Sequence, residues 1–270
     1  MTRRTRRFGV GALAVLAVTA AAPAVANAET VITMSGSTSV APLASLLAKE
    51  YVKTHKNVKF KLAQGGSDVG IADVAAGRVT IGNSSRDPKS SDSGGIFFNK
   101  IAKDAICIST NPGNPLGDLS QATIQGIFSG KITSWSDVPG AKAKGPINLV
   151  VRTAASGTQD AFQKIFMGDA KVASSASQKA SNGLVQQAIK SDPNAIGYLS
   201  LDFTAGTSPA SYKGVACDLR NAKSGEYQGV RNFWMVTRGR ATGQVAAFIN
   251  WVQTNPTAQR IVGTHWVPLI

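Results

Sequence analysis

The stretch VVRTAASGTQD, residues 150–160, does most to decide the fold. The apolar residues Ile147, Leu149, Val150 and Val151 predict a short buried strand that ends at Arg152. An amphipathic helix is expected to begin around Ser156-Gly157-Thr158, because apolar residues recur at helical spacing after it. At the start of such a helix the backbone N–H groups have no helical partner, and the helix dipole favours a negative charge there.

The side chains of this stretch also suit an anion. Ser156 and Thr158 bring two hydroxyl donors to the helix start. Arg152 at the strand end can make a bidentate, charge-assisted contact with a tetrahedral oxyanion. A capped helix with a surface arginine explains the same residues, because Ser and Thr begin many helices. Taken alone, the stretch favours this simpler interpretation.

The first 28 residues have the three parts of an export signal. An arginine-rich start is followed by an apolar segment, Val10–Ala22, and by the small residues Ala26-Asn27-Ala28. We therefore expect cleavage after Ala28 and a mature chain that begins at Glu29. The apolar segment is too short to be a permanent membrane span.

The export route and the final location stay open at this point. Arg6-Arg7-Phe8 is compatible with a twin-arginine (Tat) signal, but its spacing is imperfect and a Sec signal fits at least as well. No cysteine lies near Ala28, so no lipobox cysteine and no lipid anchor are expected. We expect an exported protein that is secreted, periplasmic or associated with the cell wall, and at most peripheral to a membrane.

Residues 29–270 are enough for one large domain or two small ones. Without the four arginines of the signal, 25 basic and 15 acidic residues leave a net charge of +10. The lysines are scattered and form no run interleaved with aromatic residues, so nucleic-acid binding is not expected. Cys107 and Cys217 allow a disulfide in an exported chain. Because Cys107 lies in an apolar run, two separate buried thiols are equally compatible.

Three further strands are expected at residues 29–34, 58–62 and 79–81, and each is followed by a loop rich in hydroxyl groups. The loops are Ser35-Gly36-Ser37-Thr38-Ser39, Gln64-Gly65-Gly66-Ser67-Asp68 and Gly82-Asn83-Ser84-Ser85-Arg86. Strand, loop and helix alternate here, which predicts an α/β lobe with a parallel sheet. In such sheets ligands bind at the carboxyl ends of the strands. Each loop alone is also ordinary turn chemistry, but three in succession predict one anion site.

The order of motifs along the chain resembles the phosphate-binding proteins of phosphate ABC importers. The motifs are GSTSVAP, QGGSDVGI, IGNSSR, TNPGNPL, IFSGKITSW, VVRTAASGTQDAF, AIGYLS, FWMVTRG and WVPL. The resemblance extends from about residue 33 to residue 269. It implies an α/β, two-lobed type II periplasmic-binding-protein fold, each lobe a mixed sheet flanked by helices. Two crossover strands are expected near Ala105–Ser109 and Arg231–Met235, with the ligand enclosed when the lobes close.

These crossovers would divide the chain into a signal peptide, residues 1–28, and two lobes. The first lobe would be discontinuous, residues 29–107 plus 231–270, and the second would be residues 108–230. The resemblance implies that a monomer captures inorganic phosphate and delivers it to the permease subunits of an ABC transporter. It implies no catalytic residue, no cofactor and no metal.

The family's phosphate contacts carry over to matching positions of this sequence. The expected ligand residues are Ser37, Thr38, Ser39, Ser67, Asp68, Ser85, Arg152, Ser156, Gly157 and Thr158, with Ser84 and Arg86 as further candidates. Many members have Ala-Ser-Asp where this chain has Asn83-Ser84-Ser85. That aspartate accepts the proton of monohydrogen phosphate and repels sulfate, which has no proton.

Asp68 is one hypothesis for the missing acceptor, because it follows Ser67 at a helix start that faces the same crevice. A cap that complements the helix dipole is an equally good interpretation of Asp68. Arg86 is expected either to reach the ligand or to pair with Asp87 or Asp68, and an ion pair at the surface is favoured.

Other functions remain as alternatives. A binding protein for sulfate, molybdate or a phosphorylated metabolite would have a similar cleft. An exported phosphatase or other hydrolase is less favoured, because His55 and His265 lie near no nucleophile elbow and no cluster with metal-ligand spacing. A wall-associated signalling module is a third class, since no lipid anchor is expected.

Overall fold

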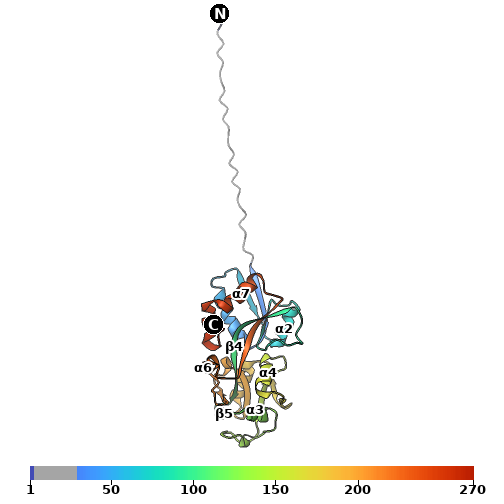
Figure 1. The fold of residues 1–270 in the computed structure, drawn as a ribbon, viewed down its shortest axis with the longest axis vertical. Coiled ribbons are helices and arrows are strands. Elements are labelled where there is room, and N and C mark those ends of the chain that lie inside the picture. The colour runs from blue at the N-terminus through green and yellow to red at the C-terminus, as the bar shows by residue number, and fades with distance from the viewer. Residues whose placement is uncertain (3–28) are drawn as a thin grey trace.

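Two sheets that share one long strand organise the fold (Figure 1). The computed structural model describes residues 1–2 and 29–270, so the predicted signal peptide lies outside the described residues. The strands are β1 Thr30–Gly36, β2 Val58–Leu62, β3 Ile81–Ser84, β4 Ile96–Thr110, β5 Asp118–Leu119, β6 Asn148–Arg152, β7 Ser177–Lys179, β8 Ala195–Ser200, β9 Ser208–Pro209, β10 Ser211–Tyr212 and β11 Val230–Arg238. The helices are α1 Ala41–Tyr51, α2 Ser67–Ala75, α3 Gln121–Phe128, α4 Gly157–Phe162, α5 Asn182–Ser191, α6 Leu219–Ser224, α7 Gly243–Thr254 and α8 Pro256–His265.

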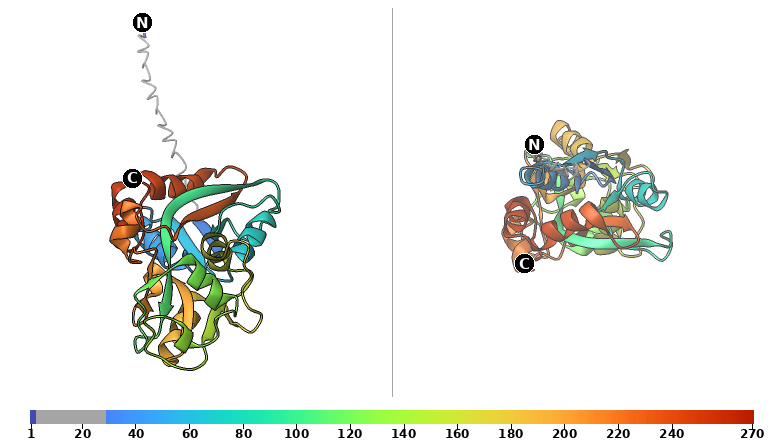
Figure 2. Two further views of the ribbon diagram at one scale, coloured as in Figure 1. Left: turned by 60° about the horizontal axis from the view of Figure 1, so that its bottom comes forward. Right: turned by 90° about the horizontal axis from the view of Figure 1, so that it is seen from above.

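Strand β4 is common to both sheets. Its residues 96–105 pair with β11, and residues 106–110 pair with β8. The first sheet has the order β2-β1-β3-β11-β4 and the second continues as β4-β8-β6-β7, with β9 also on β4. The sequence predicts a strand over residues 101–110, and β4 begins five residues earlier because β11 pairs with the preceding residues. One continuous strand therefore carries the chain from one lobe to the other (Figure 2).

The first lobe repeats strand and helix, as expected. β1 pairs in parallel with β2 and with β3, and α1 and α2 follow β1 and β2 in the chain. The sequence predicted the third strand at residues 79–81, whereas β3 spans Ile81–Ser84. The strand lies further along because Asn83 pairs with Gly36 of β1 and Ser84 with Trp234 of β11. Three residues expected in a loop, Gly82, Asn83 and Ser84, are thus fixed in the sheet.

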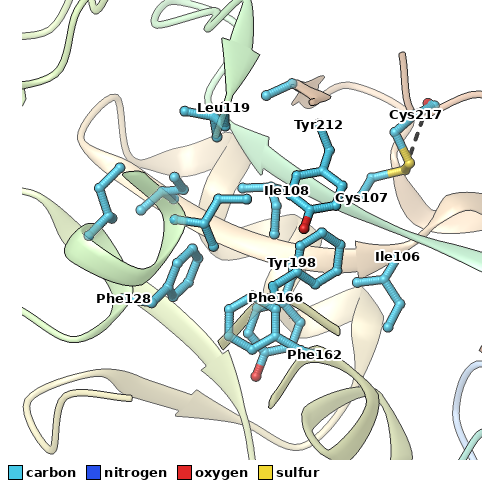
Figure 3. Packing of buried hydrophobic residues seen from close by; sticks show 14 of the residues in the cluster. Ile106, Cys107, Ile108, Leu119, Phe128, Phe162, Phe166, Tyr198, Tyr212 and Cys217 are labelled. Carbon is cyan, nitrogen blue, oxygen red and sulfur yellow. Dashed lines mark hydrogen bonds between the residues drawn. A yellow bond between two sulfur atoms is a disulfide. The ribbon is translucent and has the colours of Figure 1, made fainter. Parts of the chain in front are cut away.

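The second lobe has an aromatic core. Phe162 stacks on Tyr198 with ring centroids 3.9 Å apart, and Phe128 and Phe166 pack beside them (Figure 3). A disulfide joins Cys107 to Cys217 with the Cα atoms 5.6 Å apart, so the disulfide is the correct alternative of the two. It ties β4 to the segment before α6.

Two helices were not expected from the sequence. α6 lies in the stretch 208–231, which was expected to be mostly loop, and Asp218 caps it by accepting from the backbone N–H of Asn221 at 2.8 Å. α8 begins at Pro256 after the cap Asn255 and lies between the helix predicted to end at Thr254 and the apolar tail expected at residues 265–270. In residues 29–270, no helix has the length and hydropathy needed to cross a membrane.

Candidate anion-binding site

Five buried hydroxyl groups from different loops meet between the lobes. We call Ser37, Ser39, Ser67, Ser85 and Thr158 the hydroxyl cluster, and each is at most 3% exposed. Ser37 donates from Oγ to Oγ of Ser85 at 2.8 Å, and Oγ of Ser67 lies 3.3 Å from the same atom. The three loops of the first lobe that the sequence singled out therefore do converge.

The predicted loop of the second lobe joins this cluster. Oγ of Ser39 and Oγ1 of Thr158 are 3.0 Å apart, although the residues come from different lobes. The backbone N–H of Asp68 donates to the carbonyl oxygen of Ala155 at 3.1 Å. A Cβ atom on Gly157 would lie 2.3 Å from Oγ of Ser67 and 2.9 Å from the backbone nitrogen of Arg86. Only glycine allows this close approach of the lobes.

Local sequence explains the shape of the second-lobe loop. β6 ends at Arg152, and Ser156 caps α4 by accepting from the backbone N–H groups of Thr158 and Gln159 at 3.1 and 3.4 Å. This is the cap that the simpler interpretation expected. The same loop, however, carries Thr158 into the hydroxyl cluster, so capping and contact with the cluster occur together.

Arg152 is a buried positive charge with neutral partners. Its side chain is 2% exposed, and it donates to the carbonyl oxygens of Lys179 and Ala180 at 3.2 and 2.9 Å. Nη1 donates to Oγ1 of Thr158 at 3.4 Å. Within residues 29–270, no carboxylate forms an ion pair with it. Burial, and then the positive charge of Arg231, lower the pKa of Arg152 to about 10. The site therefore holds a charge that an anion would stabilise.

Asp68 and Arg86 form an ion pair beside the cluster. Nε of Arg86 lies 2.6 Å from Oδ1 of Asp68, and the guanidinium group also makes two contacts with Asp92. The side chain of Arg86 is 4% exposed, so this pair is more buried than the surface pair that the sequence predicted, and Asp92 was not anticipated. The carboxylate of Asp68 is 42% exposed, unlike the hydroxyl groups. Burial alone would lower the pKa of Arg86, but the bonds to Asp92 and Asp68 outweigh it and raise that pKa.

Two other candidates have local roles. Oγ of Ser84 donates to the carbonyl oxygen of Arg86 at 2.8 Å and accepts from its backbone N–H at 3.2 Å. Thr38 lies next to the cluster and is 5% exposed, and its Oγ1 is 3.4 Å from Nδ2 of Asn182.

Four buried polar residues beside the cluster were missed by the sequence reasoning. Arg231 on β11 pairs with Asp104 on β4, with Nη2 and Oδ2 2.8 Å apart, and both are at most 6% exposed. Asn182 and Ser200, from α5 and β8, complete the group. The sequence could have indicated Asp104 and Arg231, because each is a charged residue in or beside a predicted buried strand. A buried charge needs a partner of opposite charge. No sequence feature distinguished Asn182 from an ordinary residue at a helix start.

Two α/β lobes that share a crossover strand and enclose a buried polar cluster define a two-lobed binding protein of type II topology. The comparisons with known proteins agree. The chain belongs to the PBP superfamily, whose domain model matches residues 17–256.

Relatives and solved structures within this fold have been described as phosphate-binding. The phosphate-binding protein PstS of Bacillus subtilis is 29% identical over 236 residues, which is 86% of this chain and 78% of the relative. A putative phosphate ABC transporter substrate-binding protein of Clostridium perfringens, solved with bound phosphate, superposes with a TM-score of 0.84 at 29% identity. It covers 89% of this chain, and the match spans 100% of that chain. An ABC-type phosphate transport receptor of Vibrio cholerae has a TM-score of 0.71 at 26% identity, with 87% and 99% covered.

Proposed function

We propose that this protein binds inorganic phosphate between its lobes outside the cytoplasm and delivers it to the permease of an ABC importer. The observation that carries the proposal is Arg152, a buried positive charge bonded to the hydroxyl group of Thr158 and two backbone carbonyls and, within residues 29–270, to no carboxylate. A tetrahedral anion supplies the missing negative charge and accepts from the hydroxyl donors. The named functions of the relatives above support the same ligand.

We extend this proposal to the site residues and to the lobe boundaries. The hydroxyl cluster, Arg152, Ser156, Gly157 and Thr38 would form the ligand site. The lobes would be residues 29–107 plus 231–270 and residues 108–230. The hydrophobic clusters support this division, since one gathers residues 32–102 and 233–266, and the other residues 105–227 with Val267.

We also propose that the protein acts by binding alone and is exported by the signal in residues 1–28, with cleavage after Ala28. The two histidines have other contacts. His55 stacks on Tyr51 with centroids 3.8 Å apart, and His265 pairs with Asp202 at 3.0 Å.

Isothermal titration of the purified protein with phosphate, arsenate, sulfate and molybdate tests the ligand. We expect phosphate and arsenate to bind, because they share size and protonation chemistry, and a preference for sulfate or molybdate would overturn the proposal. Arg152→Gln is expected to weaken phosphate binding by about 100-fold, the effect of losing a charged hydrogen-bond donor. Arg260→Gln, on the exposed face of α8, is the matched control and should leave the affinity unchanged.

A further inference from the structure

The hydroxyl group of Ser39 is bonded from three directions. Its Oγ accepts from Nδ2 of Asn182 at 2.7 Å and from Nη2 of Arg231 at 2.9 Å. A guanidinium group has no acceptor, so Arg231 can only donate. These two donors occupy both lone pairs of the Ser39 oxygen. Its own proton is left to point at Oγ1 of Thr158, the third neighbour, at 3.0 Å.

The amide of Asn182 can adopt only one orientation. Its Oδ1 accepts from the backbone N–H of Ser200 at 3.2 Å, and a backbone N–H can only donate. The amide oxygen must therefore face Ser200, and the amide nitrogen must face Ser39. The side chain of Asn182 is 0% exposed, so water does not compete for these bonds.

Arg231 is held just as firmly. Oδ2 of Asp104 accepts from its Nε at 3.0 Å and from its Nη2 at 2.8 Å, and Oγ of Ser200 donates to the same carboxylate at 2.9 Å. Ser39, Asn182, Ser200, Asp104 and Arg231 thus form a closed ring of hydrogen bonds, which we call the buried ring. It takes Ser39 from the first lobe and Ser200 from the second.

The orientation of Ser39 passes to the next hydroxyl group. Oγ1 of Thr158 accepts from Ser39 and from Nη1 of Arg152, at 3.0 and 3.4 Å. Its two lone pairs are then in use, and its proton is available for donation. The hydroxyl group of Thr158 is therefore the donor that remains for an anion beside Arg152.

We propose that Asn182 is a positioning residue that keeps the hydroxyl group of Ser39 a donor to Thr158, so that the proton of Thr158 is left for the bound oxyanion. The proposal rests on the phosphate site proposed above. Without the amide nitrogen, a lone pair of Ser39 is free and the hydroxyl group can rotate. In part of the population Ser39 then accepts the proton of Thr158, which is no longer available to the anion, and binding is weakened.

A double-mutant cycle with phosphate titrations tests this role. The four proteins are the parent, Asn182→Ala, Ser39→Ala and the double variant, each checked for cooperative thermal unfolding. If Asn182 acts through Ser39, its removal should weaken phosphate binding about tenfold in the parent and have little effect when residue 39 is alanine. A merely structural role would cost the same affinity in both backgrounds.

Asn182→Asp gives a second cycle should the alanine variant fold poorly. The carboxylate has nearly the same shape but only accepts, so the proton of Ser39 turns toward it. Repulsion between the new charge and the anion is common to both backgrounds, so the cycle removes it. We expect a larger loss with Ser39 present than with alanine at position 39.

The outcomes separate this proposal from the proposed function. If the parent does not bind phosphate, the proposed function is overturned. If the parent binds phosphate and the loss from Asn182→Ala is equal in the two backgrounds, or is absent, only the role of Asn182 is overturned.

Discussion

Gly157 shows how a single residue sets the distance between two lobes. A Cβ atom at this position would overlap Oγ of Ser67 and approach Oγ of Ser85 to 2.8 Å, and both atoms belong to the other lobe. We expect Gly157→Ala to hold the lobes apart and to weaken phosphate binding by about tenfold or more, since the closed state loses population.

Gly183 is the matched control for this substitution. It also lies in the first turn of a helix beside the site, but the nearest atom to an added Cβ is Oγ of Ser181 at 3.9 Å. Gly183→Ala should therefore bind phosphate as the parent does. Equal affinities of the Gly157→Ala variant and the parent, measured by titration, would show that the close approach does not limit closure.

The ion pair between Asp68 and Arg86 allows a test of whether Asp68 is the acceptor of the phosphate proton. Its carboxylate accepts from Arg86 rather than from the hydroxyl cluster, and it is 42% exposed. We expect Asp68→Asn to keep phosphate affinity within about threefold, because a partly exposed ion pair contributes little. Loss of phosphate affinity together with a gain in sulfate affinity would instead identify Asp68 as the acceptor of the phosphate proton.

At the residue scale, the hydroxyl groups and Arg152 could be predicted from the sequence, because they belong to short recognisable motifs. Their hydrogen-bond partners could not be predicted. Asn182 and Ser39 are 143 positions apart, and Arg231 and Ser39 are 192 positions apart. Such contacts depend on how the lobes are placed, which no local pattern encodes.

The start of α4 combines a helix cap with the proposed ligand site. Ser156 accepts from two backbone N–H groups of α4, and Asn255 does the same for α8 at 2.9 and 3.4 Å. We expect Ser156→Ala and Asn255→Ala each to lower the free energy of unfolding by about 1 kcal/mol, the usual effect of losing a cap.

Only the first of these substitutions should weaken phosphate binding, because α4 begins in the proposed site and α8 does not. Denaturant unfolding gives the first quantity and calorimetric titration the second. A loss of affinity in both variants would mean that affinity follows global stability rather than the geometry of the α4 start.

Asp92 holds the segment after β3 through its ion pair with Arg86, and this pair should make the free energy of unfolding depend on pH. Burial alone would raise the pKa of Asp92, but the bonds from Arg86 and from the backbone N–H of Lys89 outweigh it and lower that pKa. A carboxylate with a lower pKa in the folded state stabilises the protein at pH values above its pKa in the unfolded state. This contribution is lost as the pH falls through its pKa in the folded state.

We therefore expect Asp92→Asn to lower the free energy of unfolding by about 2 kcal/mol at pH 7. The difference from the parent should shrink below about pH 4, where the parent carboxylate is also protonated. Urea unfolding of both proteins between pH 3 and 7 measures it, and a difference that is constant with pH would contradict the ion-pair explanation.

At the element scale, most helices and strands of both lobes were predictable from apolar periodicity. β3 and β4 differ in extent because pairing with β11, which lies far along the chain, decides how many residues join them. α6 was missed because it has 6 residues and a single buried one, Ala222, so it shows no periodic pattern.

The disulfide stabilises the whole molecule by restricting the conformations of the unfolded chain. Cys107 and Cys217 are 110 residues apart, so their bond restricts a large loop in the unfolded state. We expect Cys107→Ala/Cys217→Ala to lower the free energy of unfolding by about 3 kcal/mol, as measured by denaturant unfolding.

The affinity of the folded double variant for phosphate should stay within about threefold of the parent, because neither cysteine contacts the hydroxyl cluster. Reduction of the parent should have the same effect on stability. If reduction leaves the unfolding curve of the parent unchanged, the bond does not stabilise the fold.

The position of β11 also governs when the protein can fold. Its residues 230–238 lie between β3 and β4, so the first sheet lacks an inner strand until almost the whole chain has been synthesised. Until then β3 and β4 each expose an unpaired edge, which is the kind of surface that promotes association between chains. The second lobe has no such dependence, since its strands and most of its core lie within residues 105–230. In a nascent chain the second lobe could therefore fold early, while the first lobe would wait for residues 230–270. During that wait, the unpaired edges of β3 and β4 are a defined segment for a chaperone to protect.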